Sequence, residues 1–316
     1  MGLTKLSKEK LSNNLDLVVS VSGGKDSTAT CLYLLENGYT TNDFERVFFD
    51  TGWESKETYD YLDYLETKIG KITRLKKHVD ISQFPKETQQ MILEIESDLG
   101  FESPFVRLCF YHKCMPSRFR KWCTRSLKLE VVKDYFDNHD NDVISIIGVR
   151  RAESRARANV EEWDYHDHLD CDVWRPLYLW SEKDVIDIHN KHNILPNNLY
   201  LQGSSRVGCY PCIYAKKKEI SILSTERIKI IEKLEKYTGI HTKKTTNTQS
   251  QIERLEEVKE KYGYYFNQFF SRKEHDPFSE VVLWSKTTHG GKQFKLFDTD
   301  EPSCSKWGLC SVWENK

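Results

Sequence analysis

The stretch 20–27, Ser-Val-Ser-Gly-Gly-Lys-Asp-Ser, holds the residues of this chain best suited to bind an anion. It follows an apolar run that predicts a buried strand (15–21) and precedes a pattern that predicts a helix (27–37). Two adjacent glycines let a backbone turn sharply and approach a ligand closely. The amides and dipole of a helix N-terminus attract phosphate. The stretch therefore predicts a phosphate-binding loop, although its spacing is not that of a Walker A motif. A plain glycine turn between strand and helix is the alternative.

Two further segments carry polar side chains directly after predicted strands. Asp50-Thr51-Gly52 follows the strand predicted at 46–49, and Gly148 with Arg150 and Arg151 ends the β-branched strand predicted at 143–149. Arginines make bidentate contacts with phosphate or sulfate oxygens. The structural alternatives are a turn residue for Asp50 and a solvated helix start for the arginines, with Arg151 and Arg155 flanking Glu153.

Nine cysteines are unevenly spaced along the chain, and their number is odd. Scattered and clustered cysteines of this kind suit a metal or redox site plus core thiols better than a disulfide framework. Cys209 and Cys212 form a C-x-x-C pair, and Cys123 lies in a basic segment. Cys31 falls on the apolar side of a predicted helix and is expected in the core.

The elements that must position these residues alternate between strand and helix in the first half of the chain. A third strand is predicted at 72–79 and further helices at 56–69 and 182–193. This alternation predicts an α/β fold, with a parallel twisted sheet and helices on both faces. Ligands then bind at the carboxyl ends of the strands. We place a domain boundary near 205, which separates a nucleotide-binding part (1–205) from a smaller helical, cysteine-containing part (206–316).

The loop at 22–27 matches the SGGxDS pattern of the PP-loop, and the whole segment from about 16 to 215 resembles the PP-loop ATP pyrophosphatase and PAPS reductase family. The segments Asp50-Thr51-Gly52, 148–157 and 174–185 continue the resemblance. It implies a Rossmann-like, adenine nucleotide alpha hydrolase-like fold and an enzyme acting on ATP or another adenine nucleotide. The implied nucleotide-binding residues are Ser20, Ser22, Gly23, Gly24, Lys25, Asp26, Ser27, Asp50, Thr51, Gly52, Gly148 and Arg150. The implied catalytic residues are Lys25, Asp26, Arg150 and Arg151.

In relatives of this family, cysteines at such positions often hold a [4Fe-4S] cluster. The resemblance implies Cys123, Cys209 and Cys212 as ligands, with Cys310 or Cys304 as the fourth and Cys114 or Cys109 as weaker candidates. Thiolates also suit zinc, and a redox-active dithiol at Cys209 and Cys212 is a further alternative.

The chain departs from sulfonucleotide reductases in three ways. It lacks their C-terminal Glu-Cys-Gly-x-His motif, it has a single cysteine at 123 where cluster-bearing members have two, and its loop is intact. These departures favour ATP-dependent sulfur transfer to an acceptor with release of pyrophosphate, with Mg²⁺ held by Asp26 or Asp50. The alternatives are reduction of APS or PAPS to sulfite, and a non-catalytic nucleotide-binding subunit of a larger assembly.

The composition limits the partners. The formal net charge is −1, which argues against a globally basic nucleic-acid binder. A local basic cluster with interleaved aromatic residues, 113–125, still permits a nucleic-acid acceptor, or a basic rim for the nucleotide itself. A sulfur donor protein or thioredoxin is a possible partner. No apolar run reaches membrane-spanning length and the N-terminus lacks an apolar signal core, so a cytoplasmic location is expected.

Overall fold

A six-stranded sheet organises the first two thirds of the chain. The computed structural model describes residues 2–11, 15–245, 248–270, 276–287 and 307. The strands are β1 (Asp16–Ser20), β2 (Glu45–Asp50), β3 (Thr73–Lys76), β4 (Val143–Ile146), β5 (Trp163–His166) and β6 (Cys171–Trp174), in the order β3-β2-β1-β4-β6-β5. All neighbours are parallel except β5, which pairs antiparallel with β6. The predicted parallel sheet is confirmed.

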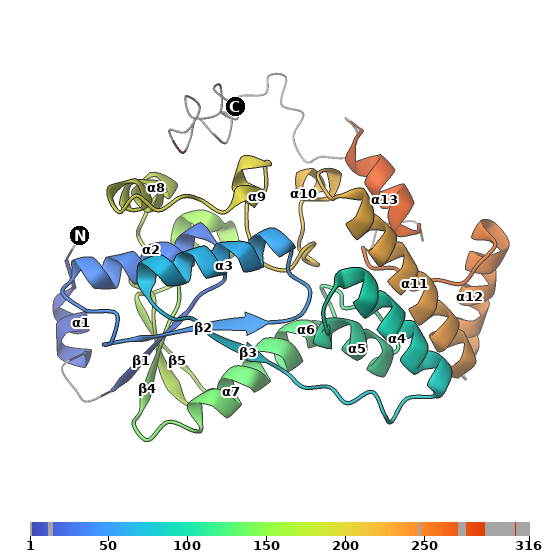
Figure 1. Cartoon of the computed structure of the whole chain (residues 1–316), viewed down its shortest axis with the longest axis horizontal. Helices are drawn as coiled ribbons and strands as arrows, with labels where there is room; N and C mark the ends of the chain where they lie inside the picture. The colour runs from blue at the N-terminus through green and yellow to red at the C-terminus, as the bar shows by residue number, and fades with distance from the viewer. Residues whose placement is uncertain (1, 12–14, 246–247, 271–275, 288–306, 308–316) are drawn as a thin grey trace.

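Helices cover both faces of the sheet (Figure 1). The helices that belong to the sheet region are α1 (Lys5–Lys10), α2 (Lys25–Glu36), α3 (Lys56–Ile69), α7 (Glu130–Phe136), α8 (Glu182–Lys191) and α9 (Asn198–Leu201), with short turns η2 (Arg151–Glu153) and η3 (Arg155–Arg157). Side chains of α2, α3 and α8 build a core cluster over one face. Val132 and Phe136 of α7 pack on the opposite face.

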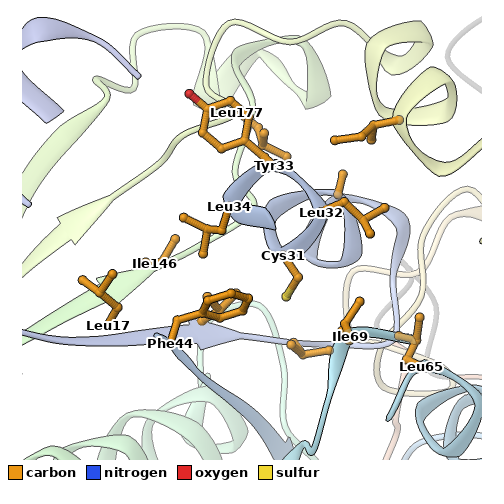
Figure 2. Close-up of a cluster of buried hydrophobic side chains, with 14 of the residues drawn as sticks. Leu17, Cys31, Leu32, Tyr33, Leu34, Phe44, Leu65, Ile69, Ile146 and Leu177 are labelled. Atoms are coloured by element: carbon orange, nitrogen blue, oxygen red, sulfur yellow. The ribbon is translucent and has the colours of Figure 1, made fainter. Parts of the chain in front are cut away.

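Continuous apolar burial explains why β1 and α2 form the centre of the fold. Val18 and Val19 have no exposed surface, and neither do Cys31 and Leu34. Figure 2 shows Cys31, Leu32 and Leu34 of α2 among Leu17, Ile69 and Ile146 from neighbouring elements. Burial raises the pKa of the Cys31 thiol to about 12. The expectation that Cys31 is a core residue is confirmed.

The helices on the side toward which β2 points (Figure 1) carry a second cluster of buried apolar side chains. Its elements are α4 (Lys86–Leu99), α5 (Pro104–Tyr111), α6 (Trp122–Thr124), η1 (Arg125–Leu129), α10 (Lys217–Ser221), α11 (Thr225–Thr245) and α13 (Phe278–Ser285), and a further helix, α12 (Gln249–Tyr262), follows α11. Ile92 and Phe105 share this cluster with Ile231 and Phe278. Residues from both sides of position 205 therefore build one core, and the boundary placed there stays a prediction.

No helix in the described ranges is long and apolar enough to cross a membrane.

Candidate functional site

The predicted phosphate loop lies between β1 and α2. Gly23 adopts a φ of +69°, a conformation that favours glycine, and Gly24 caps the N-terminus of α2. The Ser22 amide donates to Ser27 Oγ at 3.1 Å, and the Lys25 amide donates to the Tyr200 hydroxyl at 3.1 Å. Ser20 ends β1 directly before the loop. The loop is thus a backbone cradle at a helix N-terminus, the arrangement that binds phosphate.

Gly148, at the end of β4, supports the cradle from the neighbouring strand. A Cβ at this position would lie 2.6 Å from the Asp26 carbonyl oxygen and 2.9 Å from the Ser27 nitrogen. Only a glycine lets the 147–149 backbone approach the start of α2 this closely. The structure therefore gives Gly148 a packing role beneath the loop.

Two buried cations meet at Asp26. Lys25 Nζ lies 3.7 Å from Asp26 Oδ2, 3.5 Å from Glu182 Oε1 and 4.9 Å above the Tyr200 ring. Arg150 is 3% exposed, and its Nε donates to Asp26 Oδ1 at 2.5 Å while Nη1 donates to the Trp180 carbonyl at 3.2 Å. These residues come from α2 and from the segment after β4, and the fold brings them together as the sequence predicts.

Arg151 points to different partners. Its Nε donates to the Val160 carbonyl at 2.7 Å and its guanidinium lies 5.1 Å from the centre of the Tyr178 ring. Arg157, which sequence reasoning did not select, lies near enough to the loop for Asp26 to affect its pKa. Its pKa is lowered by partial burial and by the positive charges of Arg206 and Arg150, and is raised by Asp26. The spacing of arginines along 150–157 was the available signal for it.

The segment Asp50-Thr51-Gly52 is held by hydrogen bonds at the end of β2. Asp50 Oδ1 accepts from the Gly52 amide at 2.9 Å and from the Tyr59 hydroxyl at 2.7 Å, while Lys76 Nζ lies 3.7 Å from Oδ2. Gly52 has φ +67°, and a Cβ there would lie 2.7 Å from the Ser103 Cα. The glycine is therefore required both by its conformation and by the approach of the 103–104 backbone.

Glu54 connects this segment with the C-x-x-C loop. Its carboxylate, 2% exposed, accepts from Thr51 Oγ1 at 2.8 Å and lies 3.7 Å from Cys209 Sγ. Burial raises the pKa of Glu54, against the effect of the Lys128 charge. Burial also raises the pKa of the Cys209 thiol to about 12. The positive charge of Lys128 lowers the pKa of both groups and so acts against burial. The negative charges of Cys209 and Glu54 in turn raise the pKa of Lys128.

The three cysteines predicted as cluster ligands are neighbours in space. Charges on Cys212 and Cys123 each affect the pKa of Cys209, and Arg206 Nη2 donates to Cys212 Sγ at 3.5 Å. Cys114 accepts from Arg120 at 3.9 Å, and Cys109 is fully buried nearby. Among the described residues, no three His, Cys, Asp or Glu side chains are arranged to hold a metal ion. Cys304 and Cys310 lie outside the described residues.

The side chains that tie the C-x-x-C loop in place were not found from the sequence. The Tyr210 amide donates to the Trp53 carbonyl at 2.8 Å, and Trp53 Nε1 donates to the Pro211 carbonyl at 3.2 Å. Arg227 of α11 donates to the Glu54 carbonyl at 2.8 Å and lies 4.9 Å from the centre of the Trp53 ring. These partners are far apart in the sequence, and no local pattern marks them.

Comparison with known proteins agrees with this geometry. Residues 16–215 match the phosphoadenosine phosphosulfate reductase domain. The chain is 31% identical to an uncharacterised 37.8 kDa protein of Escherichia phage 186, over 93% of this chain and 96% of that protein. It is 28% identical to an adenosine 5'-phosphosulfate reductase of Neisseria meningitidis, over 52% of this chain and 59% of that enzyme.

Among solved structures, the phosphate complex of the phosphoadenylyl-sulfate reductase of Candida auris matches 64% of this chain and 85% of that one, with a TM-score of 0.44 and 14% identity. The domain match spans more than half of the chain and contains the phosphate loop, both strand-end segments and all three neighbouring cysteines. Because of this domain match, the chain belongs to the phosphoadenosine phosphosulfate reductase domain family.

Proposed function

We propose that this protein binds ATP at the phosphate loop and adenylates an oxygen of an acceptor with release of pyrophosphate. Sulfide-level sulfur then bonds to the acceptor atom that carried this oxygen, and AMP leaves with the oxygen. The observation that carries the proposal is the intact loop, in which Lys25 and Arg150 converge on Asp26 beside the N-terminus of α2. A reductase that does not split ATP has no need for a complete loop with two cations placed to bind a triphosphate.

The loop and its two cations supply the chemistry of the first step. The acceptor oxygen bonds to the α-phosphorus, and the bond from that phosphorus to the β-phosphate oxygen breaks. Negative charge builds on the departing pyrophosphate, where preorganised amides and cations stabilise it. Lys25 and Arg150 now neutralise Asp26, so an incoming triphosphate competes with this carboxylate for them. Asp26 acts in the proposal as the residue that holds both cations in place before the nucleotide binds. Arg151 is retained in the proposal as a second arginine, and its guanidinium now donates to the Val160 carbonyl.

The segment at the end of β2 is proposed to bind the adenosine side. Asp50 fixes the Gly52 amide by a hydrogen bond, and Thr51 is fixed by Glu54. The backbone groups of Thr51 and Gly52 are thereby oriented without a ligand. Asp26 and Asp50 are each paired with a cation, so neither stands free as a Mg²⁺ ligand. Mg²⁺ in such enzymes is bound largely by the phosphates of the substrate, and we assign no step of the reaction to it.

The cysteines are the proposed sulfur-handling part. Soft thiolates suit a [4Fe-4S] cluster. Burial raises the pKa of the Cys123 and Cys209 thiols, and the Lys128 charge acts against this rise. When bound, such a cluster would hold the sulfur to be transferred. The fourth ligand proposed is Cys310 or Cys304, with Cys114 as the described candidate. A zinc ion at the same thiols is the second possibility.

The experiment separates three activities. Protein purified without oxygen is incubated with ATP, and separately with APS or PAPS plus thioredoxin. Release of pyrophosphate from ATP is the expected result. Sulfite formation from APS or PAPS instead would favour the alternative suggested by the adenosine 5'-phosphosulfate reductase relative. Tight ATP binding with neither product would identify a nucleotide-binding subunit and refute the proposal.

Two matched variants make the test specific. Lys25→Met removes a cation from the loop and is expected to reduce pyrophosphate release at least about 100-fold, as expected when one transition-state contact is removed. Lys183→Met removes an exposed lysine from nearby α8 and is expected to have no effect. For the thiols, Cys212→Ser should abolish the visible absorbance of a cluster, while Cys171→Ser on β6 should not.

A further inference from the structure

A basic, aromatic surface next to the C-x-x-C loop leads to an inference about the acceptor. The surface consists of Arg118, Phe119, Arg120, Lys121, Arg125 and Tyr214. Phe119 is 98% exposed, and Tyr111 close by along the chain is 64% exposed. Large aromatic side chains at this exposure lose apolar burial unless a partner covers them.

Three of the four cations of this surface have no carboxylate partner among the described residues. In the described ranges, Arg125 has a carboxylate partner, Glu130 at 3.7 Å, and no carboxylate pairs with Arg118, Arg120 or Lys121. Arg118 and Lys121 instead lie 5.6 and 5.7 Å from the centre of the Tyr214 ring. Cations left unpaired beside exposed rings are typical of a groove that follows a phosphate backbone and stacks bases.

A hollow of about 540 Å³ opens within this surface and is lined by His112, Cys114, Arg120, Lys121, Trp122 and Arg125. Trp122 is 9% exposed, and its indole N–H has no hydrogen-bond partner in the described part of the chain. His112 Nε2, on the same lining, likewise lacks one there. Buried polar atoms are normally paired. Two unpaired ring nitrogens on side chains that line one hollow therefore favour a polar ligand there, such as the edge of a base.

Positive charge continues from the hollow to the nucleotide loop. Tyr214 lies two residues after Cys212, which accepts a hydrogen bond from Arg206. Arg206 lies close enough to Arg157 for its positive charge to lower the pKa of Arg157, as does Arg150. Arg157 itself is ion-paired with Glu153. A polyanion lying along these residues would pass the thiols and reach the proposed adenylation site.

We infer that this surface binds a single-stranded nucleic acid, with a base in the hollow and the phosphates along the cations, so that an atom of the strand is the acceptor. The inference rests on the proposed function for the reaction, but the binding itself can be tested separately. The exposed aromatic side chains favour a single strand over a duplex, because stacking requires unpaired base faces.

The test is the binding of fluorescein-labelled 12-nucleotide single strands, one RNA and one DNA, to the full chain by fluorescence anisotropy. Arg118→Glu/Lys121→Glu is expected to weaken binding at least about 10-fold and to flatten the salt dependence by about 0.7 in log–log slope for each phosphate that the variant no longer neutralises. Phe119→Ala should weaken binding by about 5-fold or more, because one base can no longer stack on the protein.

Matched controls lie far from the surface. Lys5→Glu/Lys8→Glu on α1 reverses the same charge, and Tyr165→Ala on β5 removes an exposed ring. Both controls should bind either strand as the unaltered protein does. Binding of RNA and DNA alike, or of one of them, supports the inference.

Three results would overturn it: no binding by the unaltered protein, tighter binding of the corresponding duplex, or equal binding of a polyaspartate peptide of the same charge, which would indicate an acidic protein partner. ATP binding is measured calorimetrically on the same samples. If ATP binds and the strands do not, the acceptor inference alone fails. If the strands bind and ATP does not, the proposed reaction fails.

Discussion

The close approach of Gly148 to the phosphate loop gives the sharpest prediction. In Gly148→Ala, the new Cβ would lie 2.6 Å from the Asp26 carbonyl oxygen, and ordinary contact begins near 3.4 Å. The β4 end and the α2 start must therefore separate by about 0.8 Å, because backbone atoms on both sides cannot rotate away. Overpacking of this kind costs about 1–3 kcal/mol.

The same displacement should weaken nucleotide binding. Hydrogen bonds from the loop amides to phosphate are normally about 2.9 Å long, and an extra 0.8 Å takes them beyond bonding distance. A hydrogen bond to a charged group contributes about 1.5–3 kcal/mol. Loss of one such bond predicts ATP affinity about 10- to 100-fold lower by titration calorimetry.

The control is Gly38→Ala, at the turn after α2. This glycine has φ +91°, and apart from its chain neighbours no described residue has an atom within 4 Å of the position that a Cβ would take. Alanine there therefore strains the backbone by about 1 kcal/mol without approaching the loop. Urea unfolding of both variants measures the stability loss. Equal ATP affinity of Gly148→Ala and Gly38→Ala would refute the reasoning. It would mean either that the loop does not bind ATP or that its backbone can shift without loss of affinity.

Three further predictions concern the surroundings of the site. Tyr200→Phe removes the hydroxyl that accepts from the Lys25 amide; it should cost about 1 kcal/mol of stability but raise ATP affinity up to about 5-fold, since the freed amide can bind phosphate. A lower affinity by calorimetry would contradict this. Trp53→Ala empties a fully buried site and should cost about 3–5 kcal/mol in urea unfolding, with faster proteolysis of the C-x-x-C loop; unchanged cleavage there would show that the ring does not hold the loop. Burial raises the pKa of Glu235 to about 8, so the folded state binds the proton more tightly than the unfolded chain. The free energy of unfolding should therefore fall as pH rises from about 4.5 to 8, by up to about 1.4 kcal/mol per pH unit, and Glu235→Gln should remove this slope. An identical slope in the variant would exclude Glu235 as its source.

Local patterns were sufficient to predict the nucleotide-binding half of the fold. The apolar run of β1, the glycines after it and the periodicity of α3 each specify structure within about a dozen residues. The helix predicted at 56–69 has the same limits in the structure. The loop, Lys25 and Arg150 were expected to come together because parallel strands end at one edge of a sheet.

The parts that the sequence did not reveal depend on tertiary contacts. β5 and β6 are four residues each, too short for a clear period, and β6 is recognisable only from its pairing with β4 and β5. The charged stretch after the C-x-x-C pair forms two helices, α10 and α11, because the helix breaks between Ser221 and Thr225. The contact of Glu54 with Cys209, and that of Tyr200 with Lys25, join segments more than 150 residues apart. No local sequence pattern predicts either contact.

The two outer strands of the sheet bear on how the protein behaves at high concentration. An uncovered strand edge invites pairing with another molecule. On β3, Arg74 and Lys76 present charge along one border. At the other border, helix α1 braces β5 and β6: Trp163 Nε1 donates to Ser7 Oγ at 3.0 Å, and Lys10 forms an ion pair with Asp172 at 2.8 Å. Both flanks thus discourage strand addition, so the sheet can keep a long parallel centre without recruiting neighbours into fibres.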